Sequence, residues 1–312
     1  MSEYPEGAHW SQALRAIPLV FHLENPVRQL LMRNPLPVTA LLIATLVIGE
    51  SALSAMRADS PITTNSTGDP SAQQLLKKVI DNELAADKAD DYLWLYVSES
   101  RKAGEDIKEK TLETRHGILT LELSVNGKPL AKDKETQQKE HIREMVSDPQ
   151  EAIKAQQSQQ HDADQAADML RLLPKALLAK YGTRRGDLQA LDFRPNPAFH
   201  PSSHEAEVFQ AMSGTIWVNM KEDRLEEIDG HISHRVNFGW GVLGHLDQGG
   251  RFHVVQAEVV PGHWEIVKLL VDMRGKALFF KSISVQQDET RSDYKLLPSD
   301  ITLAQGAKMI ER

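Results

Sequence analysis

The sequence predicts an α+β domain built mainly from antiparallel strands. Short apolar segments recur from residue 186 onward, at roughly the 8–12-residue spacing of antiparallel sheets. Three more strand patterns precede them and follow a single amphipathic helix. Residues 131–181 lie between the two groups. This tract is rich in Gln, Glu, Lys and Ala and predicts a helical insertion. The order of these segments favours one domain.

Composition narrows the possible functions. The chain has 312 residues, of which 41% are apolar and 26% are charged, as in ordinary globular proteins. It contains no cysteine, which excludes disulfides, thiolate zinc sites, iron–sulfur clusters and thiol nucleophiles. Acidic residues outnumber basic ones by 44 to 36, giving a net charge of −8. This balance argues against a general nucleic-acid binder.

The N-terminal region contains a pattern typical of a secretory signal. Residues 36–49 form an apolar run of about 14 residues, shorter than the roughly 20 that span a bilayer as a helix. The dipeptide Met32-Arg33 precedes the run, and small residues follow it up to Ala55. A basic start, a short apolar core and a small-residue end together predict a signal peptide with cleavage after Ala55.

Four segments follow from this pattern. They are an N-terminal extension or miscalled start at 1–31, a signal peptide or signal anchor at 32–55, a polar linker at 56–70, and a single domain at 71–312. Cleavage predicts a periplasmic protein. The alternative is an uncleaved anchor that holds the protein in the inner membrane through residues 36–55.

The domain is predicted to begin with a helix and three strands. Apolar residues recur at helical spacing from Leu75 to Leu84, behind Asp69-Pro70 as N-cap and first-turn proline. The next strand, 91–97, carries aromatic residues on one face and aliphatic residues on the other. Strands at 106–115 and 118–125 follow, the second of which ends at the hairpin signal Asn126-Gly127.

The insertion is predicted to form two or three helices. Asp148-Pro149 restarts a helix and Pro174 breaks or kinks it near its end. Residues 154–168 have little apolar face, so a solvated coil is the alternative there. The later part is strongly apolar, and a helical lid over one face of the sheet would use Met169, Leu170, Leu173 and Leu177.

The remaining strands are predicted at 187–194, 214–220, 224–229, 231–238, 250–260, 263–272, 276–286 and 291–296, with a short helix near 204–212. Two-residue turns at Pro261-Gly262 and Arg274-Gly275 would connect three of these strands.

Several strings resemble a known superfamily. Gly214–Val218, Arg224–Gly230 and the hairpin 263–285 are similar to segments of the LolA/LolB-like β-clam superfamily of periplasmic lipoprotein carriers and receptors. The resemblance covers about residues 70–300. It implies a half-open β-barrel with an N-terminal helix, whose concave face binds acyl chains under an inserted helical lid. Strings such as residues 239–246 also resemble a group of uncharacterised exported bacterial proteins.

No catalytic or metal-binding motif is present in the sequence. The twelve histidines include no H-E-x-x-H pair, and no G-x-S-x-G elbow occurs. Gly239, Gly241 and Gly244 match a G-x-G-x-x-G string, but a turn and a strand follow where a dinucleotide site needs a helix. We therefore predict no enzymatic activity, no metal and no cofactor.

A ligand site is predicted on one face of the last strands. The turn at Arg274-Gly275 would place Lys268 opposite Lys281, where like charges repel unless a phosphate or carboxylate lies between them. A shifted register, or lysines that reach solvent, are the alternatives. Trp240 lies in the glycine-rich loop, where it would either rim a ligand cleft or simply pack. The candidate ligand-binding residues are Lys268, Lys281, Trp264, Leu270, Phe279, Trp217 and Trp240.

Two functions are consistent with these patterns. The resemblance implies an exported cell-envelope protein that binds a lipid, a lipoprotein or another amphiphile through its acyl chains. The alternative is a structural or interaction module of the envelope that contacts other proteins and holds no ligand. Strands with apolar residues on both faces, such as those at Val254-Val255 and Ile266-Val267, fit either function. Neither function predicts a nucleic-acid partner.

Overall fold

The computed structural model describes residues 68–89, 91–102, 104–238, 243–277 and 281–312. The predicted extension, signal segment and most of the linker lie outside the described residues, as do Trp240 and Phe279. In the part of the chain that is described, no helix combines the length and the apolar character needed to cross a membrane.

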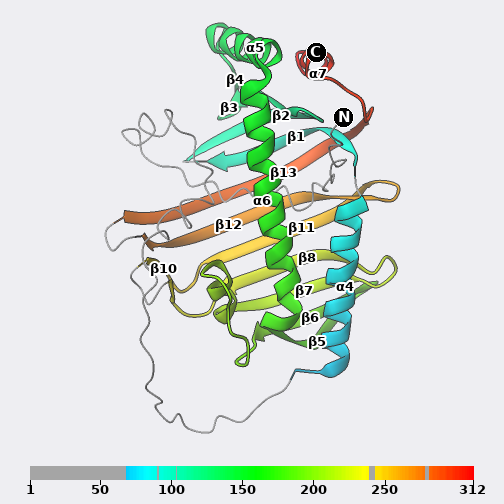
Figure 1. Ribbon diagram of the computed structural model, residues 1–312, viewed down its shortest axis with the longest axis vertical. Helices are drawn as coiled ribbons and strands as arrows, with labels where there is room; N and C mark the ends of the chain where they lie inside the picture. The colour runs from blue at the N-terminus through cyan, green and yellow to red at the C-terminus, as the bar shows by residue number, and fades with distance from the viewer. Residues whose placement is uncertain (1–67, 90, 103, 239–242, 278–280) are drawn as a thin grey trace, which may run out of the picture.

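The strands form one antiparallel sheet of thirteen strands, which is not closed into a barrel (Figure 1). Its main path runs β4-β3-β2-β1-β13-β12-β11-β8-β7-β6-β5, and β10 joins β12 to β9 beside this path. The strands are β1 (Leu93–Lys102), β2 (Glu105–Thr114), β3 (Gly117–Val125), β4 (Lys128–Pro129), β5 (Leu177–Arg185), β6 (Leu188–Pro195), β7 (Met212–Asn219), β8 (Arg224–Ile232), β9 (Val236–Phe238), β10 (Gly244–Leu246), β11 (Arg251–Val260), β12 (His263–Ala277) and β13 (Lys281–Leu297).

Two meanders build this sheet. Strands β1 to β4 run outward to one edge, and the chain then continues from the opposite edge with β5 to β8 and β11 to β13. The meanders meet where β13 pairs with β1. The insertion therefore has to carry the chain from one edge of the sheet to the other.

Helix α6 (Pro149–Ala176) makes this crossing after the shorter helix α5 (Lys132–Ser147) (Figure 1). Nine strand spacings of about 4.8 Å separate β3 from β5, a width of about 43 Å. The 28 residues of α6 extend about 42 Å at 1.5 Å each. The helix packs against both β3 and β5, so its length matches the width that the topology requires it to span.

Side-chain hydrogen bonds hold both ends of α6. Near its start, the amide of Gln156 donates to the backbone carbonyl of Arg115 between β2 and β3. Near its end, Nε2 of Gln73 donates to the carbonyls of Pro174 and Leu177, at 2.6 and 3.1 Å. Gln73 belongs to helix α4 (Pro70–Ala89), so α4, α6 and β5 are joined at one point.

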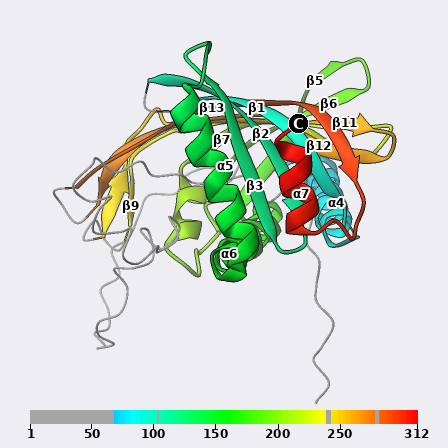
Figure 2. The same ribbon diagram turned by 90° about the horizontal axis from the view of Figure 1, so that it is seen from above.

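Helices cover the two faces of the sheet at different places. We call the face that packs against α4 and α6 the inner face, and in Figure 2 the long strands arch over these helices. Its main core cluster includes Leu76, Val79, Ile80, Leu173, Leu177, Leu191, Phe193, Ile216 and Val218. The opposite, outer face is covered over β1 to β3 by α5 and by α7 (Leu303–Ile310). This second cluster includes Leu93, Leu112, Leu119, Leu121, Ile142, Leu297, Leu303 and Ile310.

Most of the predicted elements are confirmed. The first helix is α4, the next three strands are β1 to β3, and the short helix near residue 204 is the 3₁₀ helix η1 (Glu205–Gln210). Asn126 and Gly127 both have positive φ, 52° and 71°, as the hairpin signal requires. The turn at Pro261-Gly262 connects β11 to β12.

The insertion differs from the prediction at its end. Residues 154–168 are helical within α6, so the coil alternative is wrong. The helix stops at Ala176, however, and residues 177–185 form β5, which makes Leu177 and Leu178 strand residues. Their backbones pair with β6, and this tertiary pairing overrides the helical preference of a leucine-rich segment.

Boundaries in the second meander also differ. The predicted strands at 224–229 and 231–238 correspond to β8 and β9, with the break later than expected. The strands predicted at 276–286 and 291–296 are one continuous strand, β13. The short strand β10 and the C-terminal helix α7 are not among the predicted elements.

The predicted register of the last hairpin is wrong. Lys268 lies opposite Thr290, whereas Lys281 begins β13 opposite Ala277. The two lysines are thus nine positions apart along the hairpin, about 30 Å at 3.3 Å per residue. No anionic group could lie between them.

The cause of this error is Gly275. A glycine after Arg274 indicates a turn, but β12 continues through both residues. Gly275 pairs with Leu246 of β10, and a Cβ built on it would lie 2.1 Å from the carbonyl oxygen of His245. The glycine therefore serves the close approach of a third strand rather than a turn.

Candidate functional site

Strand β1 changes from aromatic to hydroxyl side chains along its inner face. Trp94, Tyr96, Ser98 and Ser100 alternate with residues that point to the outer face, and all four are buried. The aliphatic residues that alternate with them, Leu93 and Leu95, belong to the outer-face cluster or pack against it. The predicted division of this strand into an aromatic and an aliphatic face is therefore confirmed.

The aromatic part extends across neighbouring strands as a row of ring contacts. The ring of Tyr92 lies 4.1 Å from that of His263 on β12, and Trp94 contacts both His263 and Tyr294, at 5.9 and 5.7 Å between centroids. Tyr96 stacks on Tyr294 at 5.2 Å. This aromatic row runs from the half-exposed Tyr92 into the buried middle of the sheet.

The hydroxyl part of β1 faces charged and amide side chains of β13. We call Ser98, Ser100, Gln287, Glu289 and Arg291 the polar row. Ser100 lies directly opposite Glu289, and Ser98 opposite Arg291. Glu289 accepts hydrogen bonds from Nε of Arg291 at 2.7 Å and from Nε2 of Gln287 at 2.9 Å. The guanidinium of Arg291 also lies over the ring of Tyr96 and so joins the two rows.

Some buried polar atoms here have no hydrogen-bond partner among the residues that the structure describes. They include Oγ of Ser100 and Oε1 of Gln287, and, farther along the inner face, Oε1 of Gln256 and Nε1 of Trp94. Ser100 is 4% exposed and Gln287 is 5% exposed. A buried polar atom without a partner costs about 1–3 kcal/mol, so such a group calls for a reason beyond folding.

The protonation states in this region are fixed by burial and by neighbouring charge. Burial raises the pKa of Tyr96 and of Tyr294 far above the ordinary value, although Arg291 opposes the shift. Burial also acts to lower the pKa of Arg291, but Tyr96 and Glu289 outweigh it and raise that pKa. Both tyrosines therefore keep their protons at neutral pH and Arg291 keeps its charge.

An apolar patch borders the polar row directly. Leu269 of β12 lies opposite Glu289, and Val271 lies opposite Gln287, which places each pair about 4.5–5.5 Å apart at Cβ. The buried residues of this patch are Ile266, Leu269, Val271 and Val285, with Val254 and Met273 packed against them. The inner face thus changes from polar to apolar between two neighbouring strands.

The residues predicted to bind a ligand do not form one site. Lys268 and Leu270 alternate with the buried Leu269 and therefore lie on the outer face. Trp217 also alternates with inner-face residues and is buried beneath the guanidinium of Arg185, 3.8 Å from its ring.

Trp264 lies on the inner face near α4. Its ring is 5.5 Å from the guanidinium of Arg224, which pairs with Glu83 of α4. Of the predicted ligand-binding residues that the structure describes, Trp264 is thus the one that lies among inner-face groups, at the border of α4.

The polar row gives only a weak signal in the sequence. Every residue from 286 to 291 is polar, so no alternation distinguishes a buried face from a solvated one. The alternation of Ser98 and Ser100 continues that of the aromatic residues before them, and this continuity is the signal that could have indicated an inner polar site.

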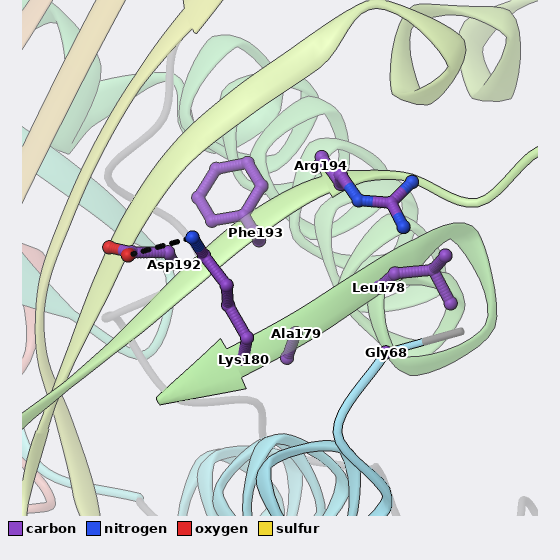
Figure 3. Close-up of a pocket in the computed structure, with 7 residues that line it drawn as sticks. All are labelled: Gly68, Leu178, Ala179, Lys180, Asp192, Phe193 and Arg194. Atoms are coloured by element: carbon purple, nitrogen blue, oxygen red, sulfur yellow. Dashed lines mark ion pairs between the residues drawn. The ribbon is translucent and has the colours of Figure 1, made fainter. Parts of the chain in front are cut away.

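A separate recess lies at the far edge of the sheet, on β5 and β6 (Figure 3). It has a volume of about 480 Å³ and is lined by Gly68, Leu178, Ala179, Lys180, Asp192, Phe193 and Arg194. The ion pair of Lys180 with Asp192 spans 3.9 Å and is solvent-exposed. Exposed ion pairs contribute little to stability, so this pair alone does not make the recess a ligand site.

No family model, no curated protein and no solved structure matches the chain. In the described part of the chain, no three His, Asp or Glu side chains are grouped so that they could hold a metal ion.

Proposed function

We propose that the protein binds an amphiphile on the inner face of its sheet. The single observation that carries this proposal is the direct contact between the polar row and the apolar patch, on neighbouring strands of one buried face. An amphiphile presents the same sequence of surfaces, a polar headgroup joined to an apolar chain. Ligand sites of proteins combine an apolar lining with a few placed polar groups in the same way.

Helix α6 supplies the cover in this proposal. It crosses in front of β1, β13 and β12 in Figure 1 and lies on the inner side in both views. It is held at β3 and at β5, the two sides of the sheet. We propose that this arrangement is a half-open β-clam whose lid is the inserted helix. The resemblance of the sequence to the LolA/LolB-like superfamily supports the same architecture.

Binding is tested with the full chain and a matched pair of variants. A fluorescent long-chain fatty acid ester is titrated into protein that has been delipidated by organic extraction. Val271→Thr keeps the side-chain shape but places a hydroxyl in the apolar patch, and we expect roughly fivefold weaker binding or more. Val255→Thr changes a half-buried valine of the outer face and should bind as the parent does.

Two results would contradict the proposal. One is a repeated absence of binding, together with a native mass spectrum that shows no co-purifying lipid before extraction. That result would favour a structural module of the envelope. The other is an equal loss of binding in both valine variants, which would show that binding does not depend on the inner face.

Export to the periplasm is part of the proposal and has its own test. The apolar run at 36–49 and the small residues after it support cleavage near Ala55. We expect N-terminal sequencing of the protein from the periplasmic fraction to begin near Met56. A protein that begins at residue 1 or 32 in the membrane fraction would instead show an anchored form.

A further inference from the structure

Hydrogen-bond chemistry narrows the headgroup that the polar row could accept. The orientation of the Gln287 amide is fixed by its partner, because a carboxylate such as Glu289 only accepts hydrogen bonds and so must face the NH₂ group. Oε1 of Gln287 is then an acceptor that points away from Glu289. The hydroxyl of Ser100, directly across from Glu289, is the second buried group without a partner among the described residues.

The charges around the polar row also disfavour an anionic headgroup. The polar row contains one carboxylate and one guanidinium, Glu289 and Arg291, and these neutralise each other at 2.7 Å. A further carboxylate, Glu109 of β2, lies opposite Ser98 and accepts a hydrogen bond from the Ser98 hydroxyl at 3.4 Å. Among the side chains that the structure describes here, negative charge therefore exceeds positive charge, and a low-dielectric setting strengthens the repulsion of another anion.

We infer that the polar row selects a headgroup that donates hydrogen bonds and carries no negative charge, a hydroxyl or an ammonium rather than a phosphate or a carboxylate. A donor satisfies Oε1 of Gln287 and can share its other hydrogens with Ser100. An anionic oxygen can accept from the Ser100 hydroxyl, but it has no hydrogen to give to Gln287 Oε1 and would lie beside that acceptor and the charge of Glu289. This inference rests on the proposed function and names its ligand class.

Three probes with the same dodecyl-length chain separate the possibilities. Monolauroylglycerol presents hydroxyl groups, dodecylamine presents an ammonium, and dodecyl phosphate presents an anion. Each is titrated below its micelle concentration into the delipidated full chain by calorimetry. We expect monolauroylglycerol, dodecylamine or both to bind at least about tenfold more tightly than dodecyl phosphate. Which of the two is preferred identifies the donor as neutral or cationic.

Substitution of Ser100 connects the preference to the polar row. Ser100→Ala should weaken binding of the preferred donor about fivefold and leave dodecyl phosphate unchanged. Ser284→Ala, an exposed serine of β13, is the matched control and should change neither. Tighter or equal binding of dodecyl phosphate would overturn the inference while leaving amphiphile binding intact, as would an unaltered preference in Ser100→Ala. If none of the three probes binds, both the inference and the proposed function fail.

Discussion

The attachment of α4 to the sheet gives a prediction whose magnitude follows from one buried ion pair. Glu83 is 6% exposed, and its carboxylate accepts hydrogen bonds from Nε and Nη2 of Arg224 at 2.8 and 3.1 Å. It also accepts the backbone N–H of Leu225 at 2.8 Å. Glu83→Ala removes all three bonds and leaves a mostly buried guanidinium, 16% exposed, without its partner.

Breaking one side of such a pair costs about 3–5 kcal/mol. For a domain of this size, each kcal/mol shifts the melting temperature by about 2–4 °C, so we expect Glu83→Ala to lower Tm by about 6–20 °C. Urea unfolding followed by circular dichroism measures the free energy directly. Tryptophan fluorescence adds a local signal, because Arg224 lies 5.5 Å from the ring of Trp264.

Two further variants separate the contribution of this buried pair from that of an exposed pair. Asp81→Ala breaks the Lys77–Asp81 pair, whose side chains are 56–65% exposed, and should cost less than about 0.5 kcal/mol. The double variant Glu83→Leu/Arg224→Met removes both charges and should be more stable than Glu83→Ala alone. A loss below about 1 kcal/mol in Glu83→Ala, or one equal to that of the control, would show that the pair does not anchor α4.

Three further predictions concern pH dependence and packing. Because folding raises the pKa of Tyr96 and Tyr294 above the ordinary 10.0, stability should fall as pH rises past that value, and replacing both by Phe should flatten this fall in urea titrations. Hydrogen bonds from Ser71, in the first turn of α4, lower the pKa of Asp69. The Asp69 cap therefore stabilises the helix above the pKa of the unfolded carboxyl group, and this stabilisation is lost as pH falls through the lowered pKa. Asp69→Ala should lower stability at neutral pH and leave it unchanged in acid. A Cβ on Gly230 would lie 2.2 Å from a ring carbon of Phe252, whereas one on Gly250 would have contacts of 3.4 Å or more. Gly230→Ala should lower the free energy of unfolding, measured with urea, by about 1–3 kcal/mol, and Gly250→Ala should lower it less.

Local signals predicted much of the fold correctly. Asn126-Gly127 and Pro261-Gly262 each define a turn through their own backbone preferences, and both turns are where the sequence predicts them. Helix α4 follows from its apolar spacing and from a cap at Asp69. These features depend on a few neighbouring residues, which is why they can be recognised without tertiary information.

The errors arise where a long-range partner decides the outcome. Gly275 resembles a turn residue, but it has to lack a side chain because the neighbouring strand β10 approaches it closely. Leu177 follows a helix without a glycine between them, and only its pairing with β6 makes it a strand residue. Helix α7 was recognisable, since Thr302 and Gln305 form a capping box. The polar row depends on the register between strands. Because a turn was predicted at Arg274-Gly275, where β12 continues, the sequence did not predict the pairing that brings these residues together.

The composition of α6 parallels the change along the inner face of the sheet. The helix advances 1.5 Å per residue and the sheet about 4.8 Å per strand, so about three residues of α6 correspond to each strand that it crosses. From Gln156, held beside β2 and β3, the polar stretch that ends at Asp168 covers about 18 Å, or roughly the next four strands. These include β1 and β13, which carry the polar row, and the apolar stretch from Met169 then joins the core of β5 to β8. A helix that bridges open space is polar where it meets solvent, and the exposed Lys154, Gln157 and Asp164 fit that role. In the amphiphile-binding function proposed above, the same division would place the polar part of the helix over the polar row.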